Sequence, residues 1–191
     1  PAKGVLRGYP PLAERQAELD ELLSKADRVV GIEDRLRAGG AVLSDDDLRF
    51  LRANHHAFGP KAKDVIVARV KARLKSDALL KPGHPAVKVI PAGRAATVAA
   101  AWVWSGPGLV SYCLVAVDRS RHLTSPAEAD QYALLPCRAE DHAREGGGKR
   151  VLPPPGANRV YVTVWAVVDL GWTTVHGPPL HLGPASVGPE K

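Results

Sequence analysis

The sequence has little of what disulfide-stabilised, membrane-spanning or secreted proteins carry. It contains two cysteines and no methionine in 191 residues, and aromatic residues make up 5% of it. Two cysteines allow at most one disulfide, which excludes a disulfide-rich secreted scaffold. The longest apolar run, Ala95 to Trp104, is far shorter than the roughly 18 residues that a spanning helix needs. The first residues also lack the apolar region of a secretory signal, so we expect a soluble, cytoplasmic chain with no membrane partner.

The sequence also lacks the short motifs that accompany common active sites. It has no GxSxG elbow, GxxxxGK phosphate loop, HExxH pair or CxxC pair. The glycine-rich stretch Gly146–Arg150 is not followed by Ser or Thr and has no strand-to-helix setting, so it indicates a hairpin tip. We therefore expect no catalytic residues, no cofactor and no metal, and a protein that is not an enzyme.

Two groups of residues have the chemistry of metal ligands without the spacing. The triplet Asp45–Asp47 follows Ser44 and lacks the alternating ligands and closing glutamate of a calcium loop, so it predicts helix capping. Four histidines, His122, His142, His176 and His181, lie in the C-terminal part and match no zinc pattern. A spatial cluster of these histidines stays open at this point.

The composition is that of an ordinary globular protein, with 45% hydrophobic and 24% charged residues. Arginine outnumbers lysine by 16 to 10, alanine and valine are plentiful, and this bias is typical of a high-GC bacterial gene. The net charge of +6 is dispersed along the chain, and basic residues are concentrated only between Lys61 and Lys81.

Residues 1–82 are predicted to form about three helices. Apolar residues recur at helical spacing from Leu12 to Ala26, after Pro10 and Pro11, and the pattern extends until Gly39-Gly40. Ser44 and the aspartate triplet predict the start of a second helix that ends at Gly59-Pro60. A third helix is predicted from Lys61 to Lys75, although the stretch Val67–Lys75 also alternates like a strand.

The third predicted helix carries most of the basic candidates for partner contact. On a helix these cations lie on the solvent side, which indicates either a phosphate-binding patch or an ordinary solvated face. No aromatic or amide residues are interleaved with them to contact bases, which favours the solvated face. The candidates are Lys61, Lys63, Arg69, Lys71, Arg73 and Lys75.

After Pro82-Gly83-His84-Pro85 the pattern changes to short β-branched runs separated by Gly and Pro, so we place a domain boundary there. Seven short strands over about 100 residues predict an antiparallel β-sandwich for residues 83–191, and therefore an α+β protein with segregated segments. The expected strands are Val87–Ile90, Ala96–Trp104, Leu109–Val117, Gln131–Cys137, Lys149–Leu152, Val160–Asp169 and Thr173–His176, with a continuation near Leu180.

Two stretches of the C-terminal part resemble a fibronectin type III module. PAGRAATVAAAWVWSGPG is similar to the second strand of that module with its core tryptophan, and LPPPGANRVYVTVWAVVDLG is similar to the turn into its sixth strand. The resemblance covers about residues 86–182 and implies an immunoglobulin-like sandwich that binds other proteins. The position of the usual tyrosine corner falls on Val160, with Tyr161 displaced by one residue.

Trp165 is a further candidate contact residue. It alternates with Val162 and Val164, so it points away from their face and is either an exposed aromatic or covered by the helices. The two cysteines, Cys113 and Cys137, have apolar neighbours and are expected to be buried, and whether they are bridged stays open.

The sequence leads to three hypotheses for function. The first is a non-enzymatic protein-interaction or scaffold module with a protein partner. The second is nucleic-acid or ribonucleoprotein binding through Lys61–Lys81, and the third is a structural subunit of a larger assembly. The sequence does not decide whether the helices pack on the sandwich.

Overall fold

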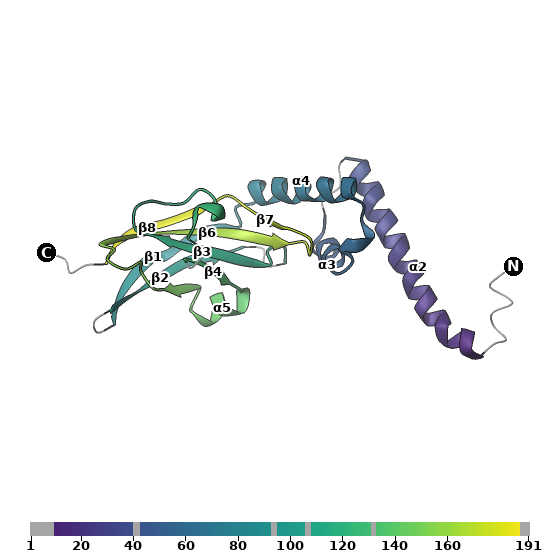
Figure 1. Cartoon of the computed structure of the whole chain (residues 1–191), viewed down its shortest axis with the longest axis horizontal. Coiled ribbons are helices and arrows are strands. Elements are labelled where there is room, and N and C mark those ends of the chain that lie inside the picture. The colour runs from purple at the N-terminus through teal and green to yellow at the C-terminus, as the bar shows by residue number, and fades with distance from the viewer. Residues whose placement is uncertain (1–9, 40–42, 93–94, 106–107, 131–132, 188–191) are drawn as a thin grey trace.

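A computed structural model describes residues 10–39, 43–92, 95–105, 108–130 and 133–187 of the chain. Helices come first along the chain and antiparallel strands follow, which confirms the predicted α+β class (Figure 1). The helical part lies at one end of the sheets, and the first helix extends away from them (Figure 1).

Three main helices form in the predicted places, although the second ends at Ala53 and not at Gly59-Pro60. They are α2 (Pro10–Arg37), α3 (Asp45–Ala53) and α4 (Pro60–Ser76), and a 3-10 turn, η2 (His55–Ala57), follows α3. The stretch from Val67 to Lys75 is helical despite its strand-like alternation. Helix is favoured here because Ile66, Val70 and Leu74, at steps of four, are all buried on one side of α4.

The start of α3 confirms the capping interpretation of the aspartate triplet. The Ser44 hydroxyl accepts a hydrogen bond from the Asp47 amide at 3.0 Å, and the Asp47 carboxylate accepts one from the Ser44 amide at 3.0 Å. This reciprocal capping box satisfies amides that the first turn leaves without helical partners.

Within the described residues, eight strands form two antiparallel sheets. One sheet has the order β1-β2-β5, and the other has the order β4-β3-β6-β7 with β8 also paired to β6. The strands are β1 (Leu80–Ala92), β2 (Ala95–Trp104), β3 (Tyr112–Asp118), β4 (Leu134–Cys137), β5 (Gly148–Val151), β6 (Arg159–Asp169), β7 (Thr174–His176) and β8 (Leu180–Ser186). All seven predicted strands are confirmed, and the continuation near Leu180 is the separate strand β8.

The link between β3 and β5 contains short helices besides β4. These are η3 (Pro126–Glu128) and α5 (Ala139–Arg144). The predicted start of the fourth strand at Gln131 lies outside the described residues, and β4 begins at Leu134.

The change from helix to strand occurs between Ser76 and Leu80, so the boundary placed after residue 82 falls inside β1. The Pro/Gly pattern at 82–85 instead marks a shift of the β1–β2 register between Pro82 and Val87. Proline has no amide hydrogen to donate to a ladder, which explains why pairing is irregular at this point.

Two large clusters of buried residues hold the chain together. The first combines inward residues of both sheets, among them Val98 and Trp102 of β2 with Val115 of β3 and Val162 of β6. This shared cluster is compatible with the predicted β-sandwich. The second cluster joins the helices to the end of the sheets, and Leu80 and Trp104 pack against both clusters.

The sequence leaves open whether the helices pack on the sheets. The second cluster shows that they do, because it contains residues of the helices and of the strands. Leu51 of α3 and Ile66 and Leu74 of α4 are buried together with Val168 of β6 and Val175 of β7. Figure 1 shows α4 lying along the same side as β7.

Candidate functional site

Among the described side chains of α2, those of its C-terminal half pack on the rest of the protein. Ile32 and Leu36 are buried in the helix–sheet cluster. Arg28 forms an ion pair with Asp46, and Arg35 contacts Asp47 at 2.8 Å, so α3 holds this half in place. The N-terminal half extends beyond α3 and α4 into solvent (Figure 1).

One side of α2, running from its free half into its packed half, carries an apolar stripe that the described chain does not cover. Leu22 is 61% exposed, Leu23 54% and Val30 56%, and Leu19 is also exposed. Helical periodicity puts these residues and Ala26 on one side of the helix. We call this side the α2 face, defined by Leu19, Leu22, Leu23, Ala26 and Val30. The side chain of Leu12, the first residue of the predicted stripe, lies outside the described part.

A groove continues the α2 face toward the body of the protein. It lies between the end of α2 and the start of α4 and has a volume of about 550 Å³. Glu33 and Arg37 follow Ala26 and Val30 by seven residues each, so they extend the same side of the helix into the groove. The lining residues are Glu33, Leu36, Arg37, Gly59, Pro60, Lys61, Ala62 and Val65.

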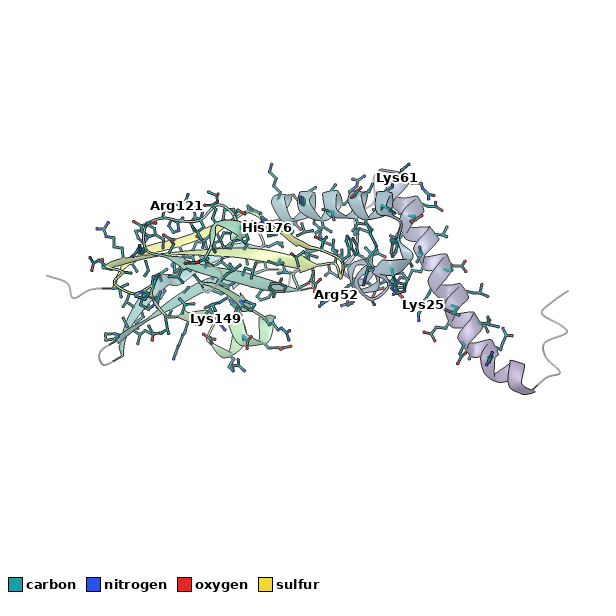
Figure 2. The ribbon with its side chains drawn as sticks, viewed as in Figure 1. Lys25, Arg52, Lys61, Arg121, Lys149 and His176 are labelled. Atoms are coloured by element: carbon teal, nitrogen blue, oxygen red, sulfur yellow. The ribbon has the colours of Figure 1, made fainter. Side chains whose placement is uncertain are left out.

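Figure 2 shows the side chains of this region. Lys25 projects from the free part of α2, and Lys61 lies at the junction of α2 and α4. The face and groove together form an apolar surface with charges at its ends, Arg15 at one end and Glu33, Arg37 and Lys61 at the groove, which is the composition expected of a protein-contact surface. The sequence reveals the apolar stripe but not its exposure. Periodicity shows which residues share one side of a helix, but not whether another element of the fold covers that side.

The basic candidates on α4 do not form one free patch. The Lys63 ammonium lies 5.5 Å from the centre of the Trp172 ring, and Arg69 donates a hydrogen bond to the Gly39 carbonyl. Arg73 donates to the Leu43 carbonyl at 2.8 Å. These three cations therefore stabilise contacts within the chain. Lys61, Lys71 and Lys75 are exposed.

Arg73 is the most strongly engaged of these cations, and its replacement should cost stability. Its guanidinium also lies 3.3 Å from Asp45 and 3.6 Å from Asp77, so it ties α4 to the start of α3. Because charge-assisted hydrogen bonds are lost, we expect Arg73→Ala to lower the free energy of unfolding by about 2 kcal/mol. Lys71→Ala, at an exposed position, should change it by less than about 0.5 kcal/mol. Urea unfolding of both variants measures the difference, and equal midpoints would contradict it.

Trp165 is not a surface residue, so the expectation of an exposed contact there is wrong. Its side chain is 0% exposed and packs with Ala116 and Leu123. The helices do not cover it either. The segment between β3 and β4 lies over it, and the Leu123 amide in this segment donates a hydrogen bond to the Thr163 hydroxyl at 3.1 Å.

Two of the four histidines singled out in the sequence lie together. The rings of His122 and His181 stack with centres 4.5 Å apart, and Tyr161 contacts His122 edge-on at 5.2 Å. His142 lies elsewhere, with its Nε2 atom 2.9 Å from the Trp102 carbonyl. Among the described residues, no three His, Cys, Asp or Glu side chains are grouped as metal ligands.

The stacked histidines should make stability depend on pH. Burial lowers the pKa of His122 from its usual 6.5, and the neighbouring His181 lowers it further. Below about pH 6.5, His122 therefore binds a proton more readily in the unfolded chain than in the folded chain. The free energy of unfolding consequently falls as pH falls. We expect His122→Phe, which keeps a ring in the stack, to lose less stability than the parent chain between about pH 7.5 and pH 5.5.

Denaturant titrations of both proteins at the two pH values measure this effect. The exposed His84 provides the matched control, and His84→Phe should behave as the parent chain does. Parallel losses in the parent chain and in His122→Phe would contradict the assignment.

Both cysteines are buried and free, as expected for small apolar residues. They face each other across β3 and β4 in the strand register. Burial raises the pKa of Cys113 to about 12 and that of Cys137 to about 11. The thiols are therefore protonated at neutral pH and poorly nucleophilic.

The described helices include none that is both long enough and apolar enough to cross a membrane. Comparison with known protein families, with curated proteins and with solved structures finds no match for this chain. The function of this protein is therefore inferred from the geometry of the α2 face and its groove.

Proposed function

We propose that this protein is a non-enzymatic protein-interaction module that binds its partner through the α2 face and the adjoining groove. The observation that supports this proposal most directly is the exposure of Leu22, Leu23 and Val30 on a helix that extends beyond its own body. A free helix of this kind gains stability when its apolar side is covered, because isolated helices have little stability of their own in water.

The body of the protein provides a rigid base for this helix. Arg28 and Arg35 join α2 to α3, and Ile32 and Leu36 anchor it in the helix–sheet cluster. A partner that contacts the free half of α2 therefore meets a surface whose direction is already set. Such pre-organisation reduces the entropy lost on binding.

We further propose that the strands form a fibronectin type III-like sandwich. In the lettering of immunoglobulin-like folds, the order β1-β2-β5 corresponds to strands A, B and E. The order β4-β3-β6 followed by β7 and β8 corresponds to C′, C, F and G. The resemblance of the two sequence stretches and this strand order support the same assignment, although fold alone does not define a function.

The proposal is tested by comparing two exposed apolar sites. Full-length parent chain, Leu22→Glu/Leu23→Glu and the control Leu152→Glu are each used to capture proteins from cells of the source organism. Leu152 directly follows β5 and its side chain is 74% exposed. The control therefore places a carboxylate at a comparably exposed apolar position outside the α2 face. We expect proteins retained by the parent and by Leu152→Glu to be lost from the double variant. Retention that is the same for all three proteins would refute the proposal.

The nucleic-acid alternative is weaker because three of its cations have partners within the chain. It depends on Lys61, Lys71 and Lys75, with Asp64 exposed on the same helix. Retention on nucleic acid that falls steeply with salt and disappears in Lys71→Glu/Lys75→Glu would support that alternative instead.

A further inference from the structure

We infer that the occupant of the α2 face is the α2 face of a second copy of this chain, packed antiparallel around a two-fold axis. This inference depends on the proposed function, because it names the partner of the same surface. It follows from the order of large, small and charged residues along the helix, which is self-complementary in only one direction.

The apolar residues fit one another when the two helices run in opposite directions. With the axis between Ser24 and Lys25, Leu19 lies level with the partner's Val30, and Leu23 with the partner's Ala26. The two-fold axis repeats both pairs. A large side chain thus faces a small one on each side of the centre, which lets the helices approach closely.

The charges at the ends of the α2 face favour the same direction. Arg15 precedes Leu22 and Glu33 follows Ala26 by seven residues each, so both lie on the same flank of the helix. In the antiparallel register Arg15 lies within one residue of level with the partner's Glu33, and the two-fold axis repeats this approach. Glu33 also pairs with Arg37 of its own helix at 3.0 Å. A parallel register would put Arg15 beside Arg15 and Glu33 beside Glu33, which is unfavourable.

The groove gives this arrangement a second contact. The same register places the first turn of the partner's α2 level with Arg37, at the groove between α2 and α4. The groove carries Arg37 and Lys61 together with Glu33, and Arg37 pairs with Glu33 at 3.0 Å and with Asp34 at 2.7 Å within its own helix.

The surface is small, which sets the expected strength of the association. Large stable homodimers bury extensive apolar area, whereas one helix face and a groove correspond to the weaker class of interfaces. We therefore expect a reversible dimer that is populated at high micromolar concentration and dissociates on dilution.

Cysteine cross-linking of the full-length chain tests the register directly. We use Leu19→Cys and Val30→Cys, and the parent chain is the background control because Cys113 and Cys137 are 0% exposed. Mild oxidation of an equal mixture of the two variants should give a disulfide-linked dimer in high yield. Each variant alone should give little, because two equivalent positions lie about 16 Å apart along the antiparallel pair at 1.5 Å per residue. Efficient linking of each variant to itself in separate samples would overturn the antiparallel arrangement.

Sedimentation provides a second measurement without new cysteines. The parent chain and Leu152→Glu should shift from 20.3 kDa toward twice that mass as concentration rises. Leu22→Glu/Leu23→Glu should stay at the monomer mass, with its helix content checked by circular dichroism. A monomer mass for the parent chain at all concentrations would refute self-association.

The outcomes separate this inference from the proposed function. If the parent chain is monomeric but Leu22→Glu/Leu23→Glu still loses a different captured protein, self-association is wrong and the interaction surface remains. If the double variant changes neither mass nor capture, both proposals fail.

Discussion

Truncation of Trp165 to alanine is expected to lower the free energy of unfolding by about 3–5 kcal/mol, the range for large aromatic side chains removed from a core. Trp165 is fully buried, and its neighbours Ala116 and Leu123 come from β3 and from the segment after it. Removing the indole ring leaves a cavity between the sheet and that segment, which the surrounding backbone fills only in part. The loss should therefore combine the transfer energy of the ring with the cost of the cavity.

Urea unfolding measures the loss, and Leu152→Ala is the control because Leu152 is mostly exposed and its truncation should change stability by less than about 0.5 kcal/mol. Hydrogen exchange should also show faster exchange of the Leu123 amide, since this amide donates to Thr163 beneath the segment. A Trp165→Ala chain as stable as the control would mean that this residue is not buried in solution.

Substitution of Gly171 by alanine should cost about 2–4 kcal/mol, because strain and overpacking add at one position. Gly171 has a φ of +89°, which L-residues rarely adopt. A β-carbon there would lie 2.8 Å from the Arg52 carbonyl oxygen and 2.8 Å from the His55 ring. The turn after β6 must therefore move away from α3, although Arg52 and Asp169 form an ion pair at 3.0 Å across the same junction.

Gly156→Ala is the matched control for this prediction. Gly156 also has a positive φ, +71°, but a β-carbon there would meet nothing within 4 Å. It should lose only the part of the stability that comes from strain, about 1–2 kcal/mol. Thermal or urea unfolding compares the two variants, and equal losses would show that the turn does not press against α3.

Local patterns were sufficient for most of the secondary structure. Ser44 with Asp47 predicts the start of α3 because a capping box uses only neighbouring residues. The four-residue steps in α4 likewise report which side of that helix is buried. A sequence pattern expresses these features directly because they depend on contacts within one element.

The candidate site could be predicted only in part. The stripe of α2 is visible in the sequence, but its exposure depends on where α3 and α4 end relative to α2. The basic patch is visible as well, but Arg69 and Arg73 bond to carbonyls about 30 residues earlier in the chain. No local pattern contains these distant partners.

By itself, the amino-acid sequence determined three helices and seven strands, since short-range sterics and hydrogen bonding fix these features. Tertiary structure alone decided that Trp165 lies under a loop, that three basic residues serve the fold, and that Leu22 and Leu23 stay uncovered. These outcomes depend on which surfaces meet. The hydrophobic effect is non-directional, so an apolar side chain gains the same free energy from any neighbour that excludes water.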